Sequence, residues 1–140
     1  MRKLFIIIFT AIMVIGTAFY VFAEDNPRMK VIAYYFHGSF RCVTCTNMEK
    51  YSREAIETNF KDALDSGKFE FKAVNVEERG NEHFANDYQL YTKSLIISLI
   101  RDGKEIRYKN LDKIWQLSRN KQKFIEYVTA EVNAFMKDMQ

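Results

Sequence analysis

The sequence is poor in the residues that disordered chains accumulate. Its 140 residues include one proline and five glycines, against 12 phenylalanines and 8 tyrosines. This composition excludes an intrinsically disordered chain. A strong charge of one sign is also missing, because the formal net charge is only +3 and Arg2 and Lys3 supply two of the positive charges. A nearly neutral domain lacks the basic surface of a nucleic-acid-binding protein, so we exclude nucleic acid as a partner.

Acidic residues are absent from residues 1–23. The basic pair near the start is followed by an almost uninterrupted apolar run over residues 4–22, and Ala23 ends the segment with a small side chain. This order predicts an export signal at 1–23 and one folded domain at 24–140. The alternative is an uncleaved N-terminal membrane anchor, since the run approaches the ~20 residues that span a bilayer.

No cysteine lies in this segment, which excludes a lipoprotein anchor. We favour cleavage of the segment. In either case we expect the domain to be exported, in the periplasm or on the extracytoplasmic face of the membrane.

Strand and helix patterns alternate along the rest of the chain. Strands are expected over residues 31–36, 69–76, 94–100 and 105–108, and helices over residues 42–66, 77–88 and 120–137, with a helical turn within 111–117. Asp102-Gly103 predicts a hairpin turn between the last two strands. The order β-α-β-α-β-β-α predicts an α/β domain in which helices flank a mixed central sheet with an antiparallel edge.

The only two cysteines, Cys42 and Cys45, lie three residues apart where the first strand gives way to a helix. A helix N-terminus offers free N–H groups and a positive dipole end, both of which favour a thiolate, and Arg41 adds a cation. The thiolate is the reactive form in disulfide exchange, and the i, i+3 spacing brings the second sulfur within bridging distance. The pair therefore predicts a reversible redox-active disulfide.

Three other interpretations of the pair stay open. A structural staple is disfavoured, because closing so short a loop contributes only about 2 kcal/mol against ~3 for a fifteen-residue loop. A structural zinc site is also disfavoured. It needs four ligands, and the chain offers only the two cysteines with His37 and His83. A Cu(I) carrier that uses both thiolates is the main alternative to redox chemistry, and a redox-inert adaptor that binds a membrane partner is the third.

The run F-H-G-x-x-R-C-x-T-C over residues 36–45 resembles the strand, loop, CxxC and helix that open thioredoxin-like proteins, and residues 75–97 are similar to the second half of a thioredoxin. With Met48-Glu49 following, the run more narrowly resembles small exported bacterial proteins of the nitrophenyl-compound nitroreductase subunit family (ArsF-like). The resemblance implies a thioredoxin-like three-layer fold and thiol-disulfide oxidoreductase activity. Cys42 would be the exposed attacking thiol and Cys45 the more buried resolving thiol.

The partners implied by this chemistry are protein thiols and disulfides or a membrane electron donor. The chain contains no G-x-G-x-x-G motif, so the sequence predicts no flavin or nicotinamide cofactor.

Three positions depart from the thioredoxin pattern. The dipeptide between the cysteines is Val43-Thr44. It does not indicate whether the reduction potential of the pair is that of a reductant or that of an oxidant. Ser94 replaces the family's cis-proline, and we expect a trans bond there because a non-proline cis bond costs about 3 kcal/mol. Lys93 beside it is a candidate cation near the thiolates, with a solvated loop residue as the alternative. The family's buried acid falls on Phe36, so His37 is the candidate substitute proton carrier, with a simple hydrogen-bonding role as the alternative.

Other residues near the cysteines receive structural interpretations. We expect Phe40 to take part mostly in core and loop packing, with a grip on a partner chain as the alternative. Trp115 is predicted to pack the last helices against the sheet. Glu49 is predicted to be a solvated helix residue.

Overall fold

The first strand is buried on both faces. The computed structural model describes residues 28–139, and in it strand β1 (Met29–His37) forms from the continuous apolar run. Val31 and Tyr35 on one face, and Ile32 and Phe36 on the other, are all less than a tenth exposed. A strand covered on both sides belongs in the interior of a sheet, and β1 is paired along both of its edges.

Four strands form one mixed sheet in the order β2-β1-β3-β4. Strand β2 (Phe69–Asn75) runs parallel to β1, whereas β3 (Ser94–Arg101) runs antiparallel to it and β4 (Lys104–Asn110) antiparallel to β3. Asp102 and Gly103 join the last two strands with φ angles of 50° and 79°. Two consecutive positive φ angles are what a tight hairpin turn requires, so the predicted Asp-Gly turn is confirmed.

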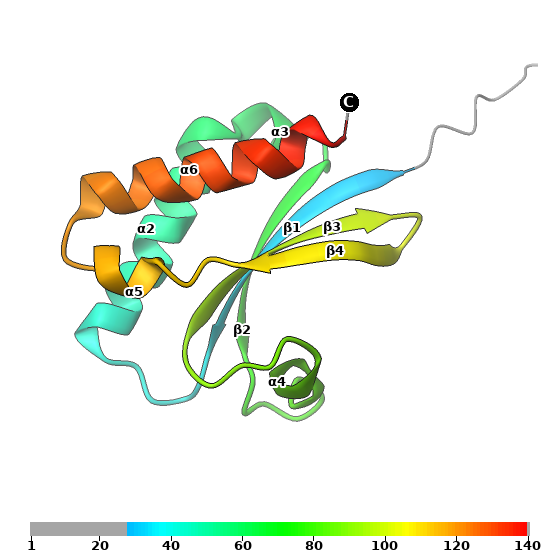
Figure 1. Ribbon diagram of the computed structural model, residues 1–140. Helices are drawn as coiled ribbons and strands as arrows, with labels where there is room; N and C mark the ends of the chain where they lie inside the picture. Colours follow the sequence, from blue (N-terminus) through cyan, green and yellow to red (C-terminus); the bar gives the residue numbers. More distant parts are fainter. Residues whose placement is uncertain (1–27, 140) are drawn as a thin grey trace, which may run out of the picture.

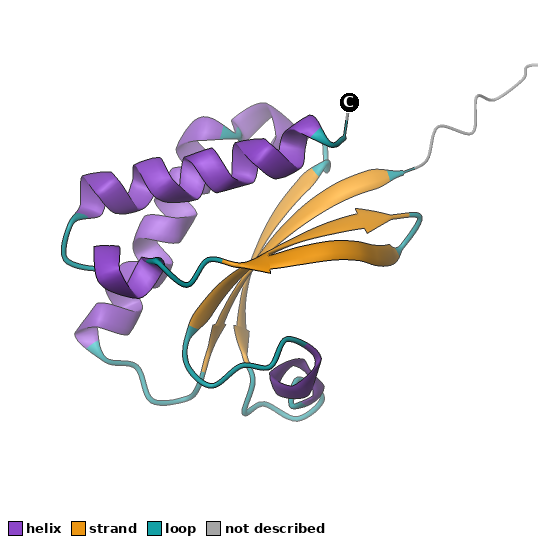
Figure 2. Ribbon diagram, viewed as in Figure 1, coloured by secondary structure: helices purple, strands orange, loops and turns teal. Residues whose placement is uncertain are grey.

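Helices lie on both faces of the sheet, but unequally (Figures 1 and 2). One face carries α2 (Val43–Asn59), α3 (Lys61–Asp65), α5 (Ile114–Leu117) and α6 (Lys121–Lys137). Among residues 28–139, the helix on the other face is the short α4 (His83–Asp87).

The element order is that predicted, and the α/β fold with a mixed sheet between helices is confirmed. The parallel pairing expected of strands separated by a helix holds for β1 and β2 but is wrong for β3. Strand β3 runs antiparallel to β1 because it starts at the end of the sheet where β2 finishes: Asn75 pairs with His37, and Ser94 pairs with Phe36.

The main core lies between the sheet and the long helices α2 and α6. It includes Val31, Ala33 and Tyr35 of β1, Leu95, Ile97 and Leu99 of β3, Met48, Ala55 and Ile56 of α2, and Phe124, Val128, Val132 and Phe135 of α6. The α6 residues recur every three or four positions, which places them on one stripe of the helix, as the sequence predicted. The Asn120 side chain caps this helix by accepting the Lys123 N–H at 3.0 Å.

A second, smaller cluster lies under α4 and is aromatic. Tyr34 and Phe36 of β1 stack with ring centroids 5.4 Å apart, and Phe84 and Tyr88 cover Phe36 at 5.1 and 5.4 Å. The Tyr88 hydroxyl donates to the Glu105 carboxylate at 2.5 Å. Burial, followed by this bond, raises the pKa of Tyr88. Alternate residues of β1 therefore pack into two separate clusters, one on each face of the sheet.

Two helices differ from their predicted extents. The helix expected over 42–66 is interrupted at Phe60, whose side chain is 8% exposed and packs edge-on against Phe69 at 5.6 Å. Burying this ring takes the chain out of helical geometry. The helix expected over 77–88 is reduced to α4, because Asn75 and Asn81 hold the preceding residues in turns: the Asn81 side chain donates to the Asn75 carbonyl at 3.0 Å.

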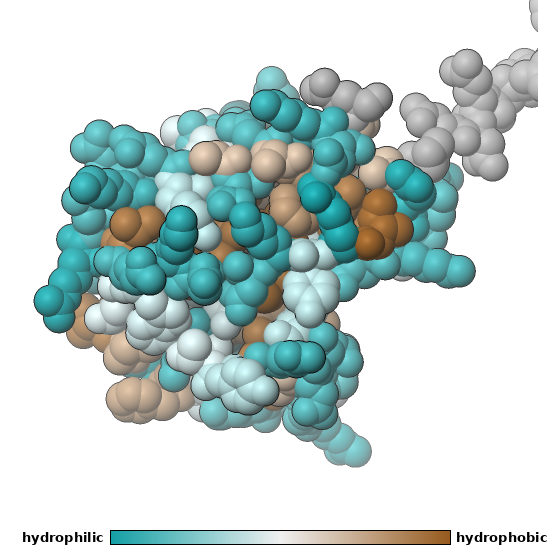
Figure 3. All heavy atoms as spheres, viewed as in Figure 1, coloured by the Kyte–Doolittle hydropathy of each residue, from teal (hydrophilic) through white to brown (hydrophobic). Residues whose placement is uncertain are grey.

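The predicted export signal or anchor at residues 1–23 lies outside the described residues, as do residues 24–27. Within 28–139, none of the helices combines the length and the apolar character needed to cross a bilayer. Figure 3 shows that the face seen in Figure 1 is largely hydrophilic, with apolar side chains in separate small areas.

Candidate functional site

Cys42 and Cys45 form a disulfide at the N-terminus of α2, with their Cα atoms 5.1 Å apart. Cys42 is the N-cap residue, with extended backbone geometry, and its sulfur accepts the Cys45 N–H at 3.1 Å. A sulfur here occupies the place that a serine or aspartate oxygen takes in most helix caps. A thiolate at Cys42 would therefore meet a free N–H and the positive end of the helix dipole.

The two sulfur-bearing residues differ in exposure. Cys45 is 2% exposed, whereas Cys42 is only half-buried. Val43 and Phe40 beside them are 79% and 77% exposed. The prediction that Phe40 packs into the core or loop is therefore wrong: its loop runs outside both hydrophobic clusters. An incoming reagent can approach Cys42 but not Cys45.

Tyr35 lies directly beneath the cysteine pair and was not singled out from the sequence. Its side chain is fully buried, and its hydroxyl donates to the Cys45 carbonyl at 2.7 Å. Burial raises the pKa of Tyr35 well above its ordinary value, partly opposed by the charge of Arg41. The position of the family's buried acid falls on Phe36, but Phe36 faces the α4 cluster. The strict alternation of a strand is the signal that would have selected Tyr35 instead.

His37 hydrogen-bonds its loop neighbours. Its Nδ1 lies 2.9 Å from the Gly38 carbonyl oxygen, and its Nε2 lies 3.4 Å from the Arg41 guanidinium. With a proton on Nδ1, the ring donates to the carbonyl and presents Nε2 as an acceptor to the arginine. These contacts fix the ring in the loop, and a proton-carrying role for His37 stays a prediction.

Arg41 is engaged by a carboxylate. Its guanidinium forms an ion pair with Glu49, which also lies 3.6 Å from Arg53. The Glu49 side chain is 19% exposed, so the expectation of a simply solvated helix residue is wrong. The reason is position: one turn after Cys45, Glu49 faces back toward the loop that carries Arg41. The predicted support of the Cys42 thiolate by Arg41 stays a prediction.

The loop before β3 is fixed by hydrogen bonds in place of a cis-proline. The peptide bonds of residues 28–139 are all trans, as expected for Ser94. The Ser94 hydroxyl donates to the Thr92 carbonyl at 3.0 Å, and the Trp115 indole N–H donates to the Lys93 carbonyl at 2.9 Å. Trp115 thus ties α5 to this loop, a contact that the sequence did not indicate.

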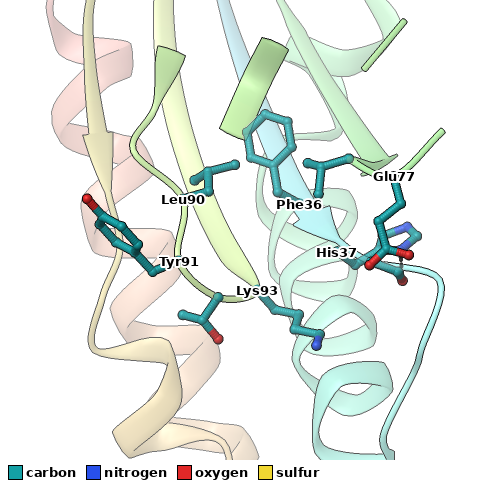
Figure 4. Close-up of a pocket in the computed structure, with 9 residues that line it drawn as sticks. Phe36, His37, Glu77, Leu90, Tyr91 and Lys93 are labelled. Carbon is teal, nitrogen blue, oxygen red and sulfur yellow. Dashed lines mark hydrogen bonds between the residues drawn. The ribbon is translucent and has the colours of Figure 1, made fainter. Parts of the chain in front are cut away.

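A small pocket of about 190 Å³ lies between this loop and the end of β1. It is lined by Phe36, His37, Gly38, Val76, Glu77, Leu90, Tyr91, Thr92 and Lys93. Figure 4 shows Phe36 and Leu90 at one end, His37 with Glu77 at the other, and the Lys93 side chain extended below them, while Tyr91 points away. The fold therefore brings two predicted site residues, His37 and Lys93, to one pocket.

The structure also bears on the metal alternative. Across residues 28–139, no three side chains of the His, Cys, Asp and Glu types group together as a metal site. A Cu(I) site at the thiolates of reduced Cys42 and Cys45 stays a prediction.

Glu77 clamps the loop that precedes the cysteines. Its carboxylate accepts the Ser39 N–H at 2.9 Å, and this bond is the main cause that lowers the pKa of Glu77 below 4.5. A carboxyl with a lowered folded-state pKa contributes stability above its unfolded pKa, and this contribution is lost as the pH falls through the lowered value.

We therefore expect Glu77→Gln to reduce the free energy of unfolding at neutral pH, and the difference from wild type to vanish at acid pH. Urea unfolding between pH 7 and pH 2.5 measures this. The matched control is Glu78→Gln, at the neighbouring exposed position. A difference that stays constant across this pH range would contradict the clamp.

Comparisons with known proteins identify no family. No protein-family model matches the chain, and neither does any curated protein. The X-ray structure of Fasciola hepatica thioredoxin is similar at 24% identity, covering 72% of this chain and 80% of that one, with a TM-score of 0.41. A structure described as a malarial protein is similar at 18% identity over 58% of this chain and 80% of that one, with a TM-score of 0.39. The fold assignment rests on the strand order and strand directions of this chain.

Proposed function

We propose that the protein is a thiol-disulfide oxidoreductase that cycles between the Cys42–Cys45 disulfide and the corresponding dithiol. The observation that carries the proposal is the unequal placement of the two sulfurs. Cys42 caps α2 at the surface, and Cys45 lies beneath it at 2% exposure. This arrangement suits one thiol for attack on a partner and reserves the other for the second step.

In the reducing direction, the Cys42 thiolate attacks one sulfur of a substrate disulfide. A bond forms between Cys42 Sγ and that sulfur, and the other substrate sulfur leaves as a thiolate that takes a proton from water. Cys45 gives its proton to water and attacks Cys42 Sγ, so that the Cys42–Cys45 bond forms and the second substrate thiolate leaves. Two electrons pass from the dithiol to the substrate, and the reverse sequence oxidises a dithiol.

The same placement disfavours a structural staple. The disulfide joins residues three apart at the edge of the fold, where it closes a very short loop. A bridge that stabilised the domain would join distant segments, such as β1 and α6.

The cellular setting belongs to the proposal as well. The acid-free, apolar segment at residues 1–23 supports export to the periplasm or the extracytoplasmic face of the membrane. The partners we propose there are protein thiols and disulfides or a membrane electron donor. The resemblance to the nitrophenyl-compound nitroreductase subunit family is carried by the run over residues 36–49 alone.

The reduction potential of the Cys42–Cys45 pair tests the proposal. Domain freed of metal by a chelator is equilibrated against glutathione buffers, and the dithiol fraction is read by mass shift after alkylation. We expect a reversible two-electron couple between about −270 mV, typical of thioredoxin, and about −120 mV, typical of a strong disulfide donor.

The outcome separates the alternatives. A potential below about −300 mV is typical of structural disulfides and would support the staple. A pair that shows no reversible couple but takes up one Cu(I) per chain would support the metal carrier.

A further inference from the structure

A recess of about 440 Å³ lies on the exposed side of α2, beside the more accessible cysteine. Its lining residues are Arg41, Thr46, Glu49, Lys50 and Arg53. Arg41 directly precedes Cys42 in the chain. Thr46 donates to the Cys42 carbonyl oxygen through its N–H at 3.0 Å and through its hydroxyl at 3.2 Å. The recess therefore begins next to Cys42.

The helix repeat aligns the rest of the recess with Cys42. Residues four, seven, eight and eleven positions further along a helix share one face with the first. Thr46, Glu49, Lys50 and Arg53 stand at these spacings from Cys42. Eight residues separate Cys42 from Lys50, which corresponds to about 12 Å along the helix axis. The recess thus extends along α2 away from the cysteine.

Positive charge is in excess in the recess. Arg41, Lys50 and Arg53 supply three cations against the carboxylate of Glu49. Glu49 contacts both arginines, and Arg53 also lies 3.6 Å from Glu57 outside the recess. Lys50 is exposed and forms no ion pair within the described part of the chain. Even with Glu57 counted, the charge of Lys50 remains in excess.

We propose that this recess selects disulfide and thiol substrates that carry an acidic side chain about four residues from the reactive cysteine. The inference rests on the proposed function, because it names the substrate class of the same site. An extended peptide advances about 3.3 Å per residue, so four residues span about 13 Å, close to the separation of Cys42 and Lys50. Side chains four apart in an extended chain point the same way, so a carboxylate faces Lys50 when the substrate sulfur faces Cys42.

Peptides with an activated cysteine test the proposal on the reduced protein. Each nine-residue peptide has blocked ends, a central cysteine joined to thiopyridine, and glutamate, glutamine or lysine at both ends, which covers both chain directions. The Cys42 thiolate bonds to the peptide sulfur, the bond to the thiopyridyl sulfur breaks, and the pyridinethiolate leaves and takes a proton from water. Absorbance of the released thione gives the rate of this step.

We expect the wild-type protein to react about threefold faster with the glutamate peptide than with the glutamine peptide at low salt, as one exposed ion pair implies. In Lys50→Gln this ratio should fall to about one, because the remaining charges of the recess offset one another. In Lys50→Glu the lysine peptide should become the fastest of the three. High salt should weaken the wild-type preference, because it screens exposed charges.

Lys104→Gln is the matched control. Lys104 is also exposed, and it pairs with Arg101 at the end of the sheet away from the cysteines. The proposal is overturned if the wild-type protein reacts equally with the glutamate and glutamine peptides, or if Lys104→Gln lowers the ratio as much as Lys50→Gln.

This experiment also separates the recess from the proposed function. Attack on an activated peptide needs only a reactive thiolate at Cys42, so the ratio of rates decides the role of the recess even if the pair shows no reversible couple with glutathione. A reversible couple without any preference for the glutamate peptide would refute the recess alone and leave the oxidoreductase intact.

Discussion

Replacing Cys42 with serine will reduce disulfide exchange to the rate of the buffer alone. Cys42 carries the accessible sulfur, which accepts a helix N–H at 3.1 Å, and Cys45 is 2% exposed. A serine hydroxyl preserves the helix cap but is not ionised at neutral pH and forms no bond to sulfur. The variant should therefore fold normally and lose activity completely. Insulin reduction with dithiothreitol as electron donor measures the loss.

Cys45→Ser should behave differently, since the first step remains possible. We expect this variant to accumulate a covalent mixed disulfide between Cys42 and the substrate, visible as a mass increase on a non-reducing gel. Thr44→Ser, at an exposed position between the two cysteines, is the control and should retain exchange. If instead Cys42→Ser is trapped and Cys45→Ser is not, the assignment of the two roles is reversed.

The largest loss of stability is expected for Phe124→Ala. Phe124 begins the buried stripe of α6, is 0% exposed, and meets the ring of Tyr51 edge-on at 5.7 Å. Removing a buried aromatic ring costs about 3–5 kcal/mol, because the transfer free energy is lost and a cavity remains. Small domains have total stabilities of about 5–15 kcal/mol. The variant should therefore be close to unfolding at 37 °C.

Urea unfolding followed by far-ultraviolet circular dichroism measures this change. The matched control is Phe40→Ala, which removes the same ring from a position that is 77% exposed. Surface substitutions of this kind usually change stability by less than about 0.5 kcal/mol. Equal losses for the two variants would show that the core does not lie between the sheet and α6.

Patterns within a single segment predicted the elements that local physics determines. The spacing of Phe124, Val128 and Val132 already defines the buried stripe of α6, and Asp102-Gly103 already defines the hairpin, since neither depends on a distant residue. The end of α2 could not be predicted in this way. Helix α2 ends at Phe60, whose ring packs against Phe69. Nothing within the helical pattern around Phe60 indicates that contact.

The same distinction between local patterns and long-range contacts applies to the candidate site. The cysteine pair and its place at the start of a helix were evident from the sequence. The three-residue spacing of the cysteines and the change from a strand pattern to a helical pattern define them. The contacts that fix the site join residues far apart in the chain. Trp115 reaches Lys93 and Tyr35 reaches Cys45 only once the strands and helices are packed together. In particular, choosing Tyr35 over Phe36 required knowing which face of β1 looks toward α2.

The direction of β1 determines how far the sulfurs stand from the start of the domain. Met29 pairs with Arg101 at one end of the sheet, and the strand runs nine residues before the chain reaches the cysteine loop. Its eight steps of about 3.3 Å separate the two ends of the strand by about 26 Å. A chain held to a bilayer by its N-terminus would thus present its disulfide on the far side of the domain. An electron donor in that membrane would need a part that projects about as far from the bilayer surface to reach Cys42.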